Sequence, residues 1–314
     1  MSIFFNTERA PYRDIFMEES YVYRVLELLL KDQTTGKNIV WATDTYKVYN
    51  SNTGVDSEMQ KSDILDLINK DLLVPRVYKN TTTQKDRTKE RAEVFTPSWV
   101  CNRMNNCCDN DWFGREGVFN IENDDNTWTS TTDKIDFGDK AWNKYVDSRR
   151  LEITCGEAPY LVSRYDTVSG AYIDVKDRIG ILDRKIRVIN ENVDNEKDWL
   201  KWVYRAYEST YGYEYQGDNL FFARVNLLMT FADYYTDRFG IEPNDKYIKK
   251  VANIIFWNLW QMDGLKDTVP YVPYENTFIS SLILGYVEDT SIYCKIKDWR
   301  SNKTFEFREM KESV

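Results

Sequence analysis

The stretch LEITCGEAPYL, which runs from Leu151 to Leu161, decides the expected fold. It begins with a short β-type run that Gly156 interrupts. A strand that ends in a glycine turn lets backbone N–H groups approach a ligand closely. Folds of the α/β class use this arrangement to hold anionic or zwitterionic cofactors at the carboxyl edge of a sheet. One glycine is a weak signal, because a buried strand followed by a tight turn produces the same pattern.

Two later runs strengthen this pattern. The run YGYEYQGDN, from Tyr211 to Asn219, predicts a strand that ends near Glu214. The run IIFWNLWQMDGL, from Ile254 to Leu265, predicts a third strand that ends at Asp263. A carboxylate after a second strand can accept both ribose hydroxyls of an adenosyl group, and one after a third strand can accept the adenine amino group. Taken singly, each acid is as readily a solvated loop residue.

The segments around these strands show the periodicity of helices. Apolar residues recur at three- and four-residue spacings from Glu196 to Thr210, from Asn219 to Tyr235 and from Tyr247 to Asn258. Strands that alternate with helices predict a parallel sheet and an α/β fold. Since the carboxyl ends of parallel strands meet at one edge, we expect Gly156, Glu214 and Asp263 to converge there.

The composition excludes several catalytic classes. The 314 residues include no histidine, which rules out Ser-His-Asp and Cys-His nucleophile activation, imidazole acid–base chemistry and histidine-ligated metals. Five cysteines without a CxxC pair indicate neither a disulfide framework nor a tetrathiolate zinc site. A net charge of −9 disfavours indiscriminate electrostatic coating of DNA. Because we find no secretory signal and no apolar run of about 20 residues, we expect a soluble cytoplasmic protein with no membrane partner.

We expect three regions along the chain. Residues 1–92 predict a mixed α/β N-terminal region, with an amphipathic helix early on and β-type runs at Ile39 to Ala42 and Tyr46 to Tyr49. The polar stretch from Lys79 to Glu93 contains the first boundary. Residues 93–268 predict the α/β core, and residues 269–314 a small β tail with a hairpin around Arg300 to Asn302.

At this point the sequence resembles a known family. The segment Val94-Phe95-Thr96-Pro97 and the three runs quoted above look like successive motifs of the S-adenosylmethionine-dependent adenine amino-methyltransferases of restriction-modification systems. The likeness is closest to restriction enzyme modification subunits, including a branch from phages and bacteria, and it covers roughly residues 85–265. It implies a Rossmann-like methyltransferase core, S-adenosylmethionine as cofactor and DNA as partner.

The resemblance also implies roles for particular residues. The segment Phe95, Thr96 and Pro97 would contact the methionine part of the cofactor. Cys155, Gly156 and Glu157 would form the loop under its carboxylate and sugar. Glu214 would hold the ribose, and Asp263 would bind the adenine edge.

Two departures from the family pattern concern cofactor binding and catalysis, respectively. Ala158 and Pro159 replace a glycine and a small residue of the loop, and proline has no N–H to donate. The family's tetrapeptide, Asn or Asp followed by Pro-Pro and an aromatic residue, is missing, because no two prolines adjoin. Tyr271 and Tyr274, each after a proline near the expected place, are the candidate catalytic residues that remain.

The leading prediction is therefore a DNA adenine methyltransferase or its cofactor-binding subunit. The first alternative is a catalytically inactive, methyltransferase-like accessory or interaction protein. Only about fifty residues follow Leu265, so either the fold is shortened or a partner chain completes it. The second alternative is a metal-dependent nuclease that uses Asp166, Asp174 and Lys176, although such spacings are common by chance.

Overall fold

The computed structural model describes residues 12–79, 84, 87–89, 96–271 and 291–311. The α-helices are α1 (Tyr21–Leu29), α2 (Lys61–Asn69), α4 (Ser98–Phe113), α5 (Trp142–Val146), α6 (Ile181–Asn192), α7 (Glu196–Glu208), α8 (Gly217–Phe239), α9 (Asp245–Asn258) and α11 (Phe307–Lys311). The strands are β1 (Asn120–Glu122), β2 (Trp128–Ser130), β3 (Arg150–Glu152), β4 (Thr210–Glu214), β5 (Leu259–Gln261), β6 (Lys295–Asp298) and β7 (Lys303–Glu306). Short 3₁₀ turns cover Tyr12–Phe16, Arg76–Tyr78 and Val175–Asp177.

A parallel sheet of three strands in the order β3-β4-β5 forms the centre of the molecule. Glu152 of β3 pairs with Gly212 of β4, and Glu214 of β4 pairs with Gln261 of β5. Each neighbouring pair is joined by helices, α6 and α7 in the first crossover and α8 and α9 in the second. The prediction of a mixed α/β protein with parallel strands in these three runs is confirmed.

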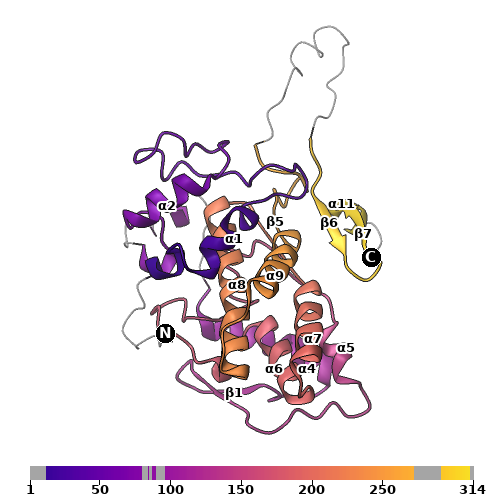
Figure 1. The fold of residues 1–314 in the computed structure, drawn as a ribbon. Coiled ribbons are helices and arrows are strands. Elements are labelled where there is room, and N and C mark those ends of the chain that lie inside the picture. The colour runs from indigo at the N-terminus through magenta and orange to yellow at the C-terminus, as the bar shows by residue number, and fades with distance from the viewer. Residues whose placement is uncertain (1–11, 80–83, 85–86, 90–95, 272–290, 312–314) are drawn as a thin grey trace.

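The two faces of this sheet are covered differently. Because side chains alternate along a strand, Leu259 belongs to the large core beneath the helices, whereas Trp260 and Tyr213 pack with Ile296 and Phe307 on the other face. Helix α9 packs against both α7 and α8, and the antiparallel hairpin β6-β7 contacts α9 through β6 (Figure 1). The predicted C-terminal hairpin is thus present, followed by a short helix.

Helix α8 is the central helix of the core. Its residues are buried without interruption from Gly217 to Ala232, and it ends at Gly240 in the left-handed conformation, with φ of 68°. Arg224 in its middle is fully buried and donates to the carbonyl oxygens of Leu29, Lys31 and Leu259. These carbonyls end α1 and begin β5, so one guanidinium joins three elements.

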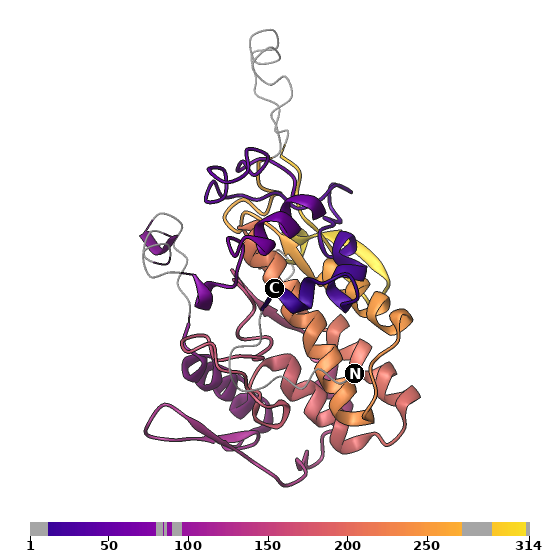
Figure 2. The ribbon, with the colours of Figure 1, turned by 60° about the vertical axis from the view of Figure 1, so that its left-hand side comes forward.

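The N-terminal region differs from the prediction. Residues 12–79 contain helices, but the predicted strands are only isolated bridges, such as Val40 with Glu58. Tyr46 to Tyr49 form a turn, in which the Tyr46 ring is buried and its hydroxyl donates to Asp218 at 2.8 Å. The predicted boundary after residue 92 lies outside the described residues. The N-terminal helices lie beside α8 and α9, as Figure 2 shows from a second side.

The N-terminal segment also contacts the sheet edge directly. The Gln261 side-chain amide exchanges two hydrogen bonds of 2.8 Å with the backbone of Val40. Gly217 donates its N–H to the Trp41 carbonyl at 2.9 Å, so the two backbones are in contact. No helix of the described residues is long and apolar enough to cross a membrane.

Replacing Gly217 by alanine tests this close approach. The added Cβ would overlap the Val40 carbonyl oxygen, a backbone atom that cannot rotate away. We expect the free energy of unfolding to fall by about 2 to 3 kcal/mol in urea denaturation. Gly54→Ala is the matched control, because its Cβ would meet only the side chains of Ser57 and Asp56, at 3.2 and 3.4 Å. Equal losses in the two variants would contradict the packing described.

Candidate functional site

The carboxyl ends of β3, β4 and β5 lie at the same rim of the sheet. Glu214 pairs with Gln261, whereas Glu152 pairs with Gly212, so β4 extends two residues beyond the end of β3. Ligands of open α/β sheets bind outside this edge. The rim is therefore the candidate functional site.

The loop after β3 turns sharply. Cys155 continues the ladder, since its N–H donates to the Tyr213 carbonyl at 2.8 Å. Thr154, Gly156 and Ala158 have φ of 47°, 54° and 64°, while the residues between them do not have positive φ. Such alternation makes a concave turn whose N–H groups suit an anion, and left-handed Thr and Ala carry strain that is common at functional sites. Burial raises the pKa of the Cys155 thiol well above its usual value, so the sulfur is not a thiolate nucleophile.

The anion at this turn is the Glu214 carboxylate. One of its oxygens accepts the Gly156 N–H at 2.8 Å, and the other accepts the Gln216 N–H at 3.0 Å. Burial raises the pKa of Glu214, and these N–H donors partly offset that effect. The structure thus brings together two predicted site residues, Gly156 and Glu214, from adjacent strands.

Glu152 is a rim residue that sequence reasoning missed. It is only 9% exposed, and its Oε2 has no hydrogen-bond partner, while Oε1 accepts the Tyr160 N–H at 3.4 Å. Burial is the main reason that its pKa is raised well above normal, and the nearby Glu214 charge adds to the rise. The signal available in the sequence was an acid placed directly before the glycine loop at a strand end.

Glu157 is committed to internal contacts. It is 2% exposed, and its carboxylate accepts the Arg76 N–H at 2.7 Å and the Tyr165 hydroxyl at 2.8 Å. Its carbonyl accepts from the Asn226 side chain at 3.1 Å. Glu157 therefore anchors the loop to the N-terminal region and to α8.

Asp263 lies just beyond β5 at the same rim. Its Oδ1 accepts the N–H groups of Leu265 and Lys266, at 3.0 and 3.3 Å, so it stabilises its own turn. Met262, next to it, donates its N–H to the Glu214 carbonyl at 3.0 Å, which keeps this turn beside β4. The carboxylate retains unused acceptor positions on Oδ2, where Lys266 Nζ is 3.8 Å away.

The structure describes part of the segment Phe95, Thr96 and Pro97, which was predicted to contact the methionine part of the cofactor. Phe95 lies outside the described residues, and Pro97 directly precedes α4. The Thr96 carbonyl accepts the Thr167 hydroxyl at 2.8 Å, and the Thr96 side chain partly offsets the rise in the pKa of Tyr160 that burial causes. Since Tyr160 belongs to the loop after β3, Thr96 borders the candidate site.

Tyr271, a predicted catalytic residue, lies near the end of β4. Its ring is 38% exposed and packs against Tyr215, with ring centroids 6.0 Å apart. Tyr215 directly follows Glu214, so Tyr271 borders the rim. Tyr274 lies outside the described residues.

A buried charge network adjoins the rim at the start of α8. Asp218 is fully buried and contacts Arg87 at 2.9 Å and Lys79 at 3.4 Å. Although burial opposes ionisation, these two cations hold the pKa of Asp218 well below its usual value. Arg87 also donates to Gln216 at 2.6 Å, so a residue from the polar stretch between Lys79 and Glu93 stabilises the turn after Glu214.

Of the residues of the nuclease alternative, Asp166 has side-chain hydrogen-bond partners. Asp166 Oδ1 accepts from the N–H and the hydroxyl of Ser169, at 2.7 and 2.8 Å, which stabilises the turn between Asp166 and Ala171. Asp174 directly precedes a 3₁₀ turn. Within the described residues no group of three or more cysteine or acidic side chains is placed to hold a metal ion.

Comparisons with known proteins leave the site to be interpreted from its geometry. No family model matches the chain, and no curated protein or solved structure gives a significant match.

Changing Glu152 to glutamine tests the buried rim. Because folding raises the pKa of Glu152, its carboxyl stays protonated in the folded protein at pH values where it is ionised in the unfolded chain. The free energy of unfolding of the wild type therefore falls as the pH rises from about 4.5 toward the folded pKa. Glutamine removes this titration. The stability of Glu152→Gln relative to wild type should therefore rise by up to about 1.4 kcal/mol per pH unit in that window. Urea denaturation from pH 4.5 to 8 measures it.

Glu116→Gln, which alters an exposed carboxylate, is the control and should show no such trend. A difference between Glu152→Gln and wild type that stays constant with pH would show that the carboxyl of Glu152 is not desolvated by folding.

Proposed function

We propose that this chain binds S-adenosylmethionine at the rim and acts as a DNA adenine methyltransferase or as the cofactor-binding subunit of one. The observation that carries the proposal is the contact of the Gly156 turn with Glu214 at the ends of adjacent parallel strands. The three strands would then be part of a Rossmann-like methyltransferase sheet. The resemblance in the motifs around these residues supports the same assignment.

The side chains at the rim fit the chemistry of this cofactor. S-adenosylmethionine supplies an activated methyl group and carries an ammonium and a sulfonium, so it presents positive charge. Glu152 offers a buried carboxyl oxygen without a partner, suited to an ammonium N–H. Glu214 uses two backbone N–H groups and retains acceptor positions for ribose hydroxyls. A cationic ligand would also relieve the unfavourable proximity of the two acids.

Catalysis requires groups that accept protons from the target amine and stack on the base. Tyr271 supplies an aromatic ring at the rim, and the carbonyl of Pro270 precedes it. Because the chain lacks the Asn/Asp-Pro-Pro-aromatic tetrapeptide, we propose that a second subunit completes the active site.

One feature of the sheet supports that partner. Among the described residues no strand pairs with β3 on the side away from β4, and Leu151 in β3 and Ile153 just after it are 43% and 63% exposed. An open edge with apolar side chains favours addition of a strand from another chain. This favours the accessory-subunit alternative over a chain that works alone.

Calorimetry with S-adenosylmethionine tests the cofactor assignment. We expect the dissociation constant to rise about ten- to a hundredfold in Glu214→Gln and in Glu152→Gln, because each loses a charge-assisted hydrogen bond. Asp263→Asn should weaken binding less, since its Oδ1 is engaged in its own turn. Glu116→Gln is the matched control. Wild-type protein that fails to bind the cofactor at millimolar concentration would refute the proposal.

Transfer of a labelled methyl group to DNA separates the enzyme from the accessory subunit. The chain alone should label adenine-containing duplex DNA, and not DNA without adenine, if it carries a complete site. Tyr271→Leu should then lower the rate while cofactor affinity stays unchanged. Cofactor binding without any labelling would identify the subunit that needs a partner.

A further inference from the structure

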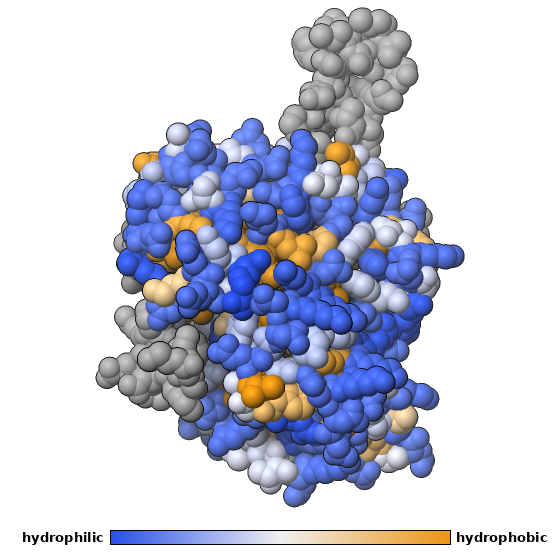
Figure 3. Space-filling model, in the orientation of Figure 1, coloured by the Kyte–Doolittle hydropathy of each residue, from blue (hydrophilic) through white to orange (hydrophobic). Residues whose placement is uncertain are grey.

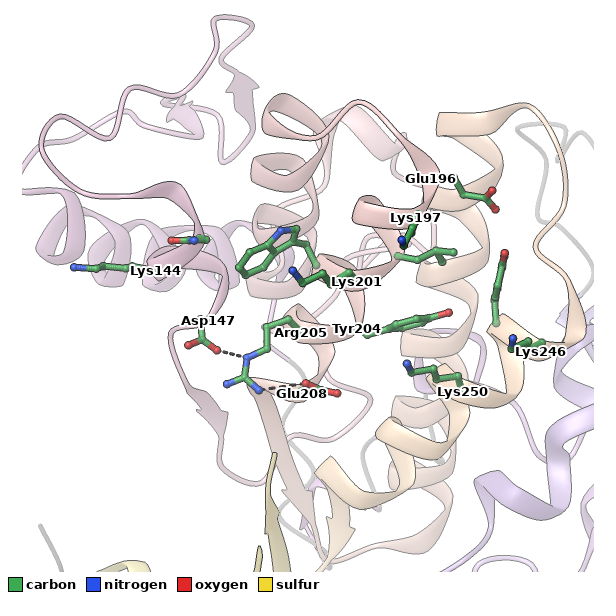
Figure 4. Close-up of a pocket in the computed structure, with 14 residues that line it drawn as sticks. Lys144, Asp147, Glu196, Lys197, Lys201, Tyr204, Arg205, Glu208, Lys246 and Lys250 are labelled. Atoms are coloured by element: carbon green, nitrogen blue, oxygen red, sulfur yellow. Dashed lines mark hydrogen bonds and ion pairs between the residues drawn. The ribbon is translucent and has the colours of Figure 1, made fainter. Parts of the chain in front are cut away.

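A groove of about 820 Å³ lies along α7, between α9 on one side and α5 on the other. It is lined mainly by charged and aromatic side chains (Figure 4). Arg205 and Glu208, at one end of the groove, lie just before Thr210, where β4 begins. The groove therefore extends toward the end of β4 opposite to Glu214, and it is a second site.

The lining of the groove is basic, although the whole chain has a net charge of −9. Six cations line it against three acids. The cations are Lys144, Lys197, Lys201, Arg205, Lys246 and Lys250, and the acids are Asp147, Glu196 and Glu208. The face visible in Figure 3 is mostly hydrophilic, with apolar side chains in small groups.

The acids do not neutralise the lysines. Asp147 and Glu208 both pair with Arg205, and Asp147 also contacts Arg300 at 2.8 Å. The five lysines of the groove are exposed, and none forms an ion pair with another described residue. Their positive charge is therefore available to an anionic ligand.

The lysines are arranged in rows. Lys197 and Lys201 are four residues apart on α7, and Lys246 and Lys250 are four apart on α9. Four residues of a helix rise about 6 Å, so each row presents charge at regular steps along the groove. A chain with one negative charge per unit can contact several of these lysines at once, which a single phosphate cannot.

Aromatic rings lie between the two rows. Tyr204 and Tyr247 are partly exposed and line the groove, and Lys250 Nζ lies 4.2 Å from the centre of the Tyr204 ring. Trp202 on α7 also lines it and packs edge-on against Trp142. A positive groove interleaved with aromatic rings is typical of proteins that bind single-stranded nucleic acid, because bases of any identity stack on the rings.

We infer that this groove binds single-stranded nucleic acid through its phosphate backbone and bases, without reading the sequence. An acidic peptide would use the lysines and leave the aromatic rings without stacking partners. This inference extends the proposed function by a second contact with nucleic acid, but it rests on the groove alone.

Fluorescence anisotropy with a labelled oligothymidine of about twelve nucleotides tests the inference. In Lys201→Gln/Lys250→Gln we expect the affinity to fall about tenfold at moderate salt. The salt dependence, as the slope of log K against log salt, should decrease by about 1.4, since each lost phosphate contact contributes about 0.7. The matched control is Lys37→Gln/Lys303→Gln, which removes the same charge from exposed positions elsewhere and should change neither value appreciably.

Further measurements distinguish single-stranded nucleic acid from other ligands of the groove. Tyr247→Leu should weaken the oligothymidine complex about fivefold without a change in salt slope, because stacking is lost and charge is kept. Displacement of the oligothymidine by polyglutamate of equal charge and at equal concentration would overturn the inference in favour of an acidic protein partner. Tighter binding of duplex than of single strands, with the same lysine dependence, would also overturn it.

Two cross-measurements separate this inference from the proposed function. Lys201→Gln/Lys250→Gln should bind S-adenosylmethionine as the wild type does, and Glu214→Gln should bind the oligothymidine as the wild type does. Loss of both activities in either variant, with a normal denaturation curve, would show that groove and rim are one site and would contradict the inference.

Discussion

The hydrogen bond from the Gly156 N–H to the Glu214 carboxylate is the constraint on which the rim depends. It joins the ends of two parallel strands that are separated by two helices in the chain. A buried carboxylate needs hydrogen-bond donors in place of water, and the turn after β3, in which positive φ angles alternate, supplies one backbone N–H. The same bond holds the loop that Glu157 ties to the N-terminal region. The position of this loop therefore follows from one buried acid.

The remainder of the fold keeps that acid buried. Arg224 closes the ends of α1 and α9 against the middle of α8, and Gln261 binds the backbone of Val40 to the edge of β5. The N-terminal region thus covers the sheet edge and belongs to the same hydrophobic core as the helices of the crossovers. The hairpin β6-β7 covers the opposite face through Ile296.

Acidic side chains gather at the rim, and basic side chains gather in the groove along α7. The rim concentrates buried acids, whose raised pKa values reflect lost hydration, and such a site suits a ligand that brings positive charge. The groove along α7 exposes lysines without ion-pair partners among the described residues and suits a polyanion. The groove extends toward the end of β4 that lies farther from the rim, so the two ligands proposed above would bind at separate places.

The three parallel strands and the helices α7, α8 and α9 could be predicted from the sequence, because periodicity is a local property that the runs at 151, 211 and 259 display clearly. The sequence also identified Gly156 and Glu214, whose meeting follows from parallel pairing. Which carboxylates are desolvated, and which accept hydrogen bonds, follows from the tertiary packing. Glu152 and Glu157 look alike in the sequence, yet one has an unpaired oxygen and the other is bonded to Arg76 and Tyr165. Desolvation depends on segments distant in the chain, and for this reason neither the partners of these acids nor the basic groove could be predicted from local pattern.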